Sequence, residues 1–82
     1  MLELRINRED ADPAYRQVYR QLREAILSGA LSPGSRLPSS RSMARDASVA
    51  RVTIVRALAQ LAAEGFVESR VGAGTYVAPD LP

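Results

Sequence analysis

The sequence predicts an α+β fold in which three helices precede a C-terminal β-hairpin. Two stretches carry apolar residues at helical spacing and end at a glycine, and a shorter stretch that begins with two adjacent serines lies between them. The last part of the chain alternates apolar and polar residues around a glycine-rich turn. Eighty-two residues are enough for one domain with a small core.

The first helix is predicted between Asp12, which we expect to be its N-cap, and Gly29, where it should end. Pro13 suits the first helical position, and Arg20 and Glu24 have the spacing of an ion pair one turn apart. The residues with the spacing of a core-facing stripe are Tyr15, Val18, Tyr19, Leu22 and Ile26. The residues expected on other faces are Arg16, Gln17, Arg20, Arg23 and Glu24.

A short second helix is predicted from Arg41 to about Ala47, after a turn at Pro33-Gly34. Either Ser39 or Ser40 can cap it. Its small apolar side is expected to consist of Met43, Ala44 and Ala47. Two arginines one turn apart, at positions 41 and 45, then face outward.

The third helix contains four consecutive β-branched residues, Val52 to Val55, which alone are typical of a strand. The longer window favours a helix over residues 51–64, because apolar residues recur at the helical period and alanines follow. Gly65 then ends the helix. The core-facing residues are predicted to be Ile54, Val55, Leu58, Leu61 and Ala62.

The opposite face of this helix is predicted to carry Val52 and Thr53, together with Arg56 and Gln60. Contact with water alone does not select an exposed valine beside an exposed threonine. The pair therefore indicates a surface that meets a partly apolar partner, such as a thymine methyl group in a DNA groove.

The C-terminal part predicts a β-hairpin, with Phe66 to Arg70 and Thr75 to Val77 as strands and a turn at Val71 to Gly74. The prolines near the end of the chain cannot continue a strand ladder. We therefore expect residues 1–78 to form the domain and residues 79–82 to begin an interdomain linker.

The composition excludes several classes of function. The sequence has no cysteine and no histidine, which removes thiolate sites, the commonest metal ligand and the commonest general base. The most plausible carboxylate pair, Glu64 and Glu68, is expected to be solvated, so we predict no metal site, no catalytic residue and no enzyme. No apolar run approaches the roughly 18 residues of a membrane span, and we expect a soluble cytoplasmic protein that does not enter membranes.

All eleven basic residues are arginine. Arginine suits phosphates and guanine edges, although a genome rich in G and C produces the same bias without a functional cause. The distribution is more informative, because residues 36–56 contain five arginines against Asp46 alone. The middle of the chain is therefore locally basic, by a charge of +4.

The predicted order of elements is that of a winged helix-turn-helix, in which the arginines of the second helix, the third helix and the hairpin share one side. This arrangement favours binding to double-stranded DNA. A winged helix used only for protein association remains the alternative, with Val52 and Val55 in a hydrophobic interface.

The sequence also resembles the GntR-type bacterial transcription regulators, and within them the MocR subgroup. The segments that carry the resemblance are Tyr15-Arg16-Gln17, Leu22-Arg23 with Ile26, SGALSPGSRLPSSR from Ser28 to Arg41, Arg51 with Thr53, LAAEGFVESR, RVGAGTYV and the VAPDLP ending. The resemblance implies a sequence-specific DNA-binding domain. It further implies that the residues that contact DNA include Ser39, Arg41, Arg51, Thr53 and Gly72.

We expect the recognition helix 51–64 to enter the major groove of an operator and the wing 70–77 to lie at the minor groove. Arg51 is predicted to read a guanine, and Thr53 a base edge or a methyl group. Ser39 and Arg41 are predicted to hold phosphates. The complete set of predicted DNA contacts is Ser39, Ser40, Arg41, Arg51, Val52, Thr53, Arg56 and Gly72.

The chain departs from the family pattern in two places. Ala47-Ser48-Val49-Ala50 stands where a typical member has Leu-Gly-Val-Ser, so a turn glycine and a serine cap of the third helix are missing. Val55 stands where many members carry a further base-reading arginine, and the helical wheel turns Val55 toward the core.

The MocR resemblance implies a homodimeric full-length protein whose second domain resembles a pyridoxal phosphate-dependent aminotransferase. This chain contains no lysine and cannot form a Schiff base with that cofactor. We therefore expect no cofactor in this chain, and pyridoxal phosphate only in a C-terminal domain of the longer protein.

Overall fold

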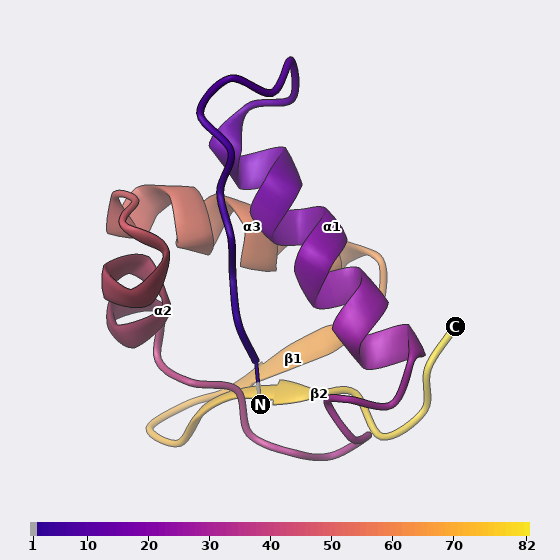
Figure 1. Cartoon of the computed structure of the whole chain (residues 1–82). Helices are drawn as coiled ribbons and strands as arrows, with labels where there is room; N and C mark the ends of the chain where they lie inside the picture. The colour runs from indigo at the N-terminus through magenta and orange to yellow at the C-terminus, as the bar shows by residue number, and fades with distance from the viewer. Residues whose placement is uncertain (1) are drawn as a thin grey trace.

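The computed structural model describes residues 2–82 and confirms the predicted order of three helices and a hairpin (Figure 1). The elements are α1 (Ala14–Leu27), α2 (Ser40–Ala47), α3 (Arg51–Ala63), β1 (Val67–Arg70) and β2 (Gly74–Val77). The two strands pair antiparallel, from Val67 opposite Val77 to Arg70 opposite Gly74. The helices stand together on one side of the hairpin. We call this hairpin, including its turn at residues 71–73, the wing.

The start of α1 differs from the prediction by one residue. Pro13 occupies the cap position with an extended ψ of 160° and makes no side-chain cap, so Asp12 is not the N-cap. The Asp12 carboxylate instead accepts a hydrogen bond of 2.6 Å from Arg20. Arg20 also lies 3.9 Å from Asp10, and it pairs with these aspartates and not with Glu24. The local spacing predicted the wrong partner because the preceding loop folds back over α1.

The segment before α1 lies along this helix in an extended conformation, as the indigo trace in Figure 1 shows. Gln17, which we predicted away from the core, is only 3% exposed. Its amide accepts from the N–H of Asn7 at 2.8 Å and donates to the carbonyl oxygens of Asn7 and Asp12. Gln21 holds Arg5 in the same two-way manner. Two side-chain amides one helical turn apart thus satisfy backbone N–H and carbonyl groups of the extended segment, as a neighbouring strand would do in a sheet.

The core lies where the three helices meet the wing. α3 packs against both α1 and α2, and the small side chain of Ala57 is fully buried on its inner face. The fully buried large side chains are Leu22, Ile26, Met43, Ile54, Leu61, Val18 and Val77. The side chains predicted for the core of α1 and α2 are confirmed, with both tyrosines of α1 only partly buried.

The segment before α2 pairs with the wing, which the sequence did not indicate. Leu37 donates to the carbonyl oxygen of Thr75 at 2.8 Å, and Val77 donates to that of Ser35 at 2.8 Å. Arg36 forms a bridge with Tyr76 between these bonds. Backbone hydrogen bonds therefore join the segment before α2 directly to β2 of the wing.

The end of the chain returns to the body of the domain. Ala78 donates a backbone hydrogen bond of 2.9 Å to Phe66, and Leu81 packs against the core. The assignment of residues 79–82 to an interdomain linker stays a prediction.

Candidate nucleic-acid interface

The N-terminus of α2 is built by two serines with different tasks. Ser39 is the cap, and its Oγ accepts from the backbone N–H of Ser42 at 3.0 Å. Ser40 is the first helical residue, and its Oγ accepts from the Nε of Arg51 at 2.9 Å. Both hydroxyl protons remain able to donate to a phosphate oxygen. Arg41 follows on the exposed side, where it forms no ion pair with the residues that the structure describes.

The turn between α2 and α3 contains a left-handed residue that is not a glycine. Ser48 adopts the left-handed conformation, with φ of 57° and ψ of 46°, which carries an energetic cost for a residue with a Cβ atom. Its carbonyl oxygen accepts a hydrogen bond from Arg8, so the N-terminal segment supports the turn. Ala50 occupies the cap position of α3 and makes no side-chain hydrogen bond, which confirms the missing cap.

The outward face of α3 carries Arg51, Val52 and Val55, and we call it the outer face of α3. Val52 is 70% exposed and Val55 is 46% exposed. The prediction that Val55 faces the core is therefore wrong, and the predicted core residue Ala62 is exposed as well. The core side of α3 centres on Ile54, Ala57 and Leu61, about 65° from the direction that the wheel predicted, because the buried alanine was credited only with helix propensity.

Two predicted contact residues lie toward the other side of α3. Thr53 is partly buried. The guanidinium of Arg56 stacks over the ring of Tyr15 in α1, with 3.6 Å from its Cζ to the ring centroid. The structure thus separates Arg56 from Arg51, and a DNA contact by Arg56 stays a prediction.

The wing presents a tight turn that requires glycine. Gly72 lies at its tip with φ of 74°, and Val71 beside it is fully exposed. Gly74 has φ of 117°, and a Cβ atom added there would lie 2.9 Å from the Nε of Arg36. Arg36 therefore lies across the base of the wing, a neighbour that no local pattern in the sequence indicated.

A groove of about 410 Å³ runs between the N-terminus of α2, the outer side of α3 and the wing. It brings Ser39 and Ser40 together with Val55 and with Thr75 of β2. Arg51 and the wing tip at Gly72 are not part of its lining, but Arg51 is hydrogen-bonded to Ser40, which is. Three of the sequence-predicted elements thus converge on one face of the domain.

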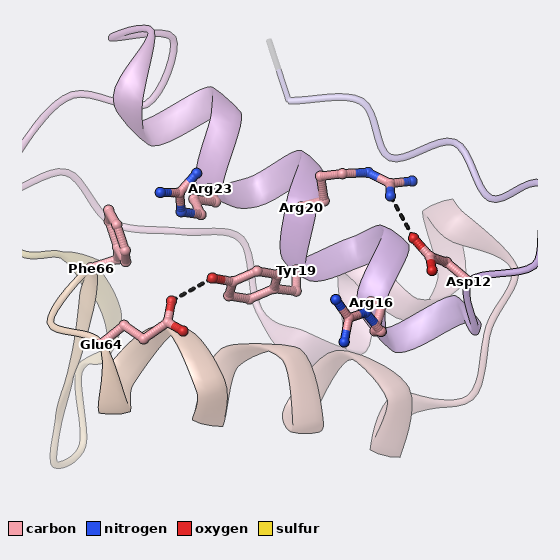
Figure 2. Close-up of a pocket in the computed structure, with 7 residues that line it drawn as sticks. All are labelled: Asp12, Arg16, Tyr19, Arg20, Arg23, Glu64 and Phe66. Atoms are coloured by element: carbon pink, nitrogen blue, oxygen red, sulfur yellow. Dashed lines mark hydrogen bonds and ion pairs between the residues drawn. The ribbon is translucent and has the colours of Figure 1, made fainter.

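A second hollow, of about 400 Å³, lies between α1 and the end of α3 (Figure 2). The Tyr19 hydroxyl donates to Glu64 across it at 2.5 Å, and Gln60 donates to the same carboxylate at 2.8 Å. The bond to Glu64 raises the pKa of Tyr19, and the bonds from Tyr19 and Gln60 lower the pKa of Glu64. The guanidinium of Arg23 lies over the ring of Phe66, with 5.4 Å from its Cζ to the ring centroid. The polar groups of this hollow are largely occupied by one another.

Within residues 2–82, histidine, cysteine and carboxylate side chains form no cluster of three that could hold a metal ion. The helices of this described part are also too short or too polar to cross a bilayer.

Comparison with known proteins identifies the family. The model of the family described as bacterial regulatory proteins, gntR family, matches residues 14–77. The chain is 50% identical over 70 residues to the probable rhizopine catabolism regulatory protein MocR of Rhizobium meliloti, a match that covers 84% of this chain and 14% of that protein. It is 38% identical over 80 residues to the pyridoxine biosynthesis transcriptional regulator PdxR of Corynebacterium glutamicum, covering 98% and 18% respectively. The chain therefore spans less than a fifth of the length of these two relatives.

Solved structures show the same architecture. YtrA from Sulfolobus acidocaldarius, a GntR-family transcription factor, superposes with a TM-score of 0.88 at 32% identity over 95% of this chain and 82% of that one. AraR(DBD) in complex with operator ORX1 superposes with a TM-score of 0.85 at 26% identity over 95% and 99%. These similarities do not favour the alternative of a protein-association module without DNA binding. The chain belongs to the GntR family of bacterial regulatory proteins and has the winged helix-turn-helix fold of its DNA-binding domains.

Proposed function

We propose that this domain binds an operator in double-stranded DNA, with α3 in the major groove and the wing at the adjacent minor groove, and thereby directs a transcription regulator to its genes. The observation that carries this proposal is the face formed by α2, the outer face of α3 and the wing. Arg41, Arg45 and Arg51 belong to these elements, and none of them forms an ion pair within residues 2–82. Structures similar to this chain include one solved with its operator.

Arg51 is the residue that we propose reads a guanine. It stands at the first position of α3, where no preceding turn of the helix covers it. The hydrogen bond from its Nε to Ser40 fixes the side chain and leaves the terminal N–H groups free for the O6 and N7 atoms of guanine. Val52 and Thr53 follow it in the first turn of α3 and would contact neighbouring base edges.

The proposed phosphate contacts come from Ser39, Ser40 and Arg41 and from the wing tip. The serine hydroxyls are donors at a helix N-terminus, where the backbone dipole also favours an anion. Gly72 lets the backbone approach the minor groove closely because no side chain intervenes. These contacts would position the domain without reading the sequence.

Arg56 differs from the other predicted contacts because its guanidinium already has a partner in α1. Its guanidinium lies flat on Tyr15, and only its edge is available to a phosphate from there. We propose it as a DNA contact of the backbone type only, to be separated from Arg51 by mutation.

For the longer protein we propose a cytoplasmic, homodimeric MocR-type regulator that pairs two such domains on two half-sites. The domain described here would act by binding and not by catalysis. This chain has no lysine, so the residues present do not suit pyridoxal phosphate, and a cofactor would belong to another domain.

Footprinting on DNA upstream of the gene, followed by titration at fixed salt, tests the proposal. Arg51→Ala should relax sequence preference and cost about 1–3 kcal/mol of binding free energy, whereas Arg41→Ala should weaken all sequences alike. Arg16→Ala is the control, because Arg16 lines the hollow on the α1 side. Wild-type affinity in both Arg51→Ala and Arg41→Ala would show that this face is not the DNA interface.

A further inference from the structure

The outer face of α3 exposes apolar surface at the place where charge would be expected. The large apolar side chains most exposed among the described residues are Leu27, Val52, Val55 and Val71. Three of these four belong to α3 and the wing tip, and only Leu27 belongs to α1. Such clustering on a proposed binding face indicates a contact that removes these side chains from water.

The two valines of α3 are spaced for neighbouring bases. They lie three residues apart, on successive turns, so their Cβ atoms are about 5–6 Å from each other. Base pairs stack about 3.4 Å apart along the duplex. Val52 stands beside Arg51 in the first turn, which enters a major groove most deeply in helix-turn-helix proteins, and Val55 follows one turn behind.

The chemistry of valine determines what it can select there. A valine side chain neither donates nor accepts a hydrogen bond, so it leaves the polar major-groove edges of guanine, adenine and unmodified cytosine unsatisfied when it displaces water from them. The C5-methyl group of thymine is the apolar feature of that groove. A cytosine methylated at C5 presents a methyl group at the same position of the pyrimidine ring.

The groove supports the placement of Val55. Val55 lines it together with Ser39 and Ser40, whose hydroxyls are the proposed phosphate donors. A DNA strand held by these hydroxyls would bring its base edges to Val55, which favours DNA over a second protein as the partner of this face.

Building on the proposed function, we propose that Val52 and Val55 form a methyl-reading pair that selects two neighbouring base pairs containing a 5-methyl pyrimidine, thymine in unmodified DNA, beside the guanine read by Arg51. The pair replaces hydrogen-bonded recognition by apolar contact over the first two turns of α3. The operator half-site should therefore contain a guanine followed or preceded by consecutive A·T pairs.

The test starts from duplexes selected from a random-sequence pool by the 82-residue chain. Each thymine of the selected half-site is then replaced in turn by deoxyuridine, which removes one methyl group and changes no hydrogen bond. We expect about fourfold weaker binding at two neighbouring positions, the factor that corresponds to about 0.8 kcal/mol per apolar carbon removed from water. Cytosine at those positions should weaken binding, and 5-methylcytosine should recover about fourfold of the loss.

Mutation assigns the effect to the two side chains. Val52→Ala and Val55→Ala should each bring the thymine-to-uracil affinity ratio close to one at a single position. Leu27→Ala, which removes an exposed apolar side chain from α1, should leave both ratios unchanged. All three side chains are exposed, so circular dichroism should show a retained fold.

The outcomes separate the two proposals. Failure of the chain to bind or enrich any duplex overturns the proposed function and the methyl-reading pair together. Binding to an enriched duplex with every uracil substitution within twofold of thymine overturns the methyl-reading pair alone. Ratios that persist in both valine variants also overturn it.

Discussion

α3 has two exposed sides, one toward α1 and one toward α2 and the wing, which we call its flanks. Arginines on the first flank contact other side chains of the domain, whereas the arginine on the second keeps free donors. The flank toward α1 carries Arg56 beside Tyr15, and Glu64 beside Tyr19, so its polar groups bind one another. The flank toward α2 and the wing carries Arg51, which binds only a serine hydroxyl and retains free donors. This second flank also exposes two valines, Val52 and Val55.

This difference shows that arginine count alone does not locate an interface in this domain. Arg20 and Arg23, on the α1 side, are held by two aspartates and a phenylalanine ring. Cations that already have partners gain little from a phosphate, because they would first lose those contacts. The informative feature is a charged or apolar group left without a partner on an exposed face.

The largest expected effect on stability comes from a mutation in the core of α3, which should disturb both flanks. Ile54 is fully buried between them, and Ile54→Ala should lower the free energy of unfolding by about 2–5 kcal/mol because it removes buried methyl groups and leaves a cavity. Urea denaturation measures the loss, and DNA affinity should fall with it. Ala59→Ser, on the exposed side of α3, is the control and should change stability by less than about 0.5 kcal/mol. Wild-type stability of Ile54→Ala would contradict the assigned packing of α3.

A gain is expected on the open flank. Ala50 has the backbone conformation of an N-cap, with φ of −66° and ψ of 146°, but no side chain that can cap. Ala50→Ser should stabilise the domain by about 1 kcal/mol through a hydrogen bond to an orphan N–H of the first turn. The melting temperatures of Ala50→Ser and Ala50→Gly, measured by thermal unfolding, separate the effect of the serine hydroxyl from that of a changed backbone preference. Equal melting temperatures of wild type and the serine variant would argue against the cap.

A mutation of Arg56 sharpens the comparison between the flanks. Because the stack on Tyr15 leaves only the edge of its guanidinium for a phosphate, Arg56→Ala should lower the free energy of unfolding by about 0.5–1 kcal/mol and weaken binding to all DNA sequences by no more than about twofold. Parallel denaturation and anisotropy titrations measure both quantities. A tenfold loss of affinity with unchanged stability would instead place Arg56 in the DNA interface, as the sequence predicted.

The smallest effect concerns pH on the closed flank. The pKa of Glu64 is lowered by its bond from Tyr19, so the stability from this bond is present above the ordinary pKa of 4.5 and is lost as pH falls through the lowered value. The pKa of Tyr19 is raised above 10.0, so its contribution is complete below pH 10 and is lost above the raised value. Tyr19→Phe should therefore be slightly less stable than wild type at pH 7, and this difference should shrink as the pH falls through the lowered pKa of Glu64. Tyr15→Phe, which keeps its ring under Arg56, should show no such pH dependence.

Local patterns in the sequence predicted the elements because short-range signals decide them. Ser39 has the expected cap bond, and Gly65 and Gly72 adopt the positive φ values that a helix end and a tight hairpin turn require. The four β-branched residues of α3 are helical because the apolar period of the longer window outweighs their strand propensity.

The contacts between distant segments were not predictable from those patterns. The hydrogen bonds of Gln17 to the N-terminal segment, the pairing of residues 34–37 with β2, and the position of Arg36 over Gly74 join residues that no period relates. Val55 was misplaced because the core side of α3 carries the small Ala57 beside Ile54, and Val55 lies outside it.

By itself, the sequence determined three helices, a hairpin, a basic middle and a resemblance to one family, because propensity, capping and composition act within a few residues of chain. Only the tertiary structure decided which flank of α3 is open, because exposure depends on what packs against each side. That packing gives Arg56, Arg20 and Arg23 partners on the α1 side, and it leaves the terminal N–H groups of Arg51 and the two valines exposed.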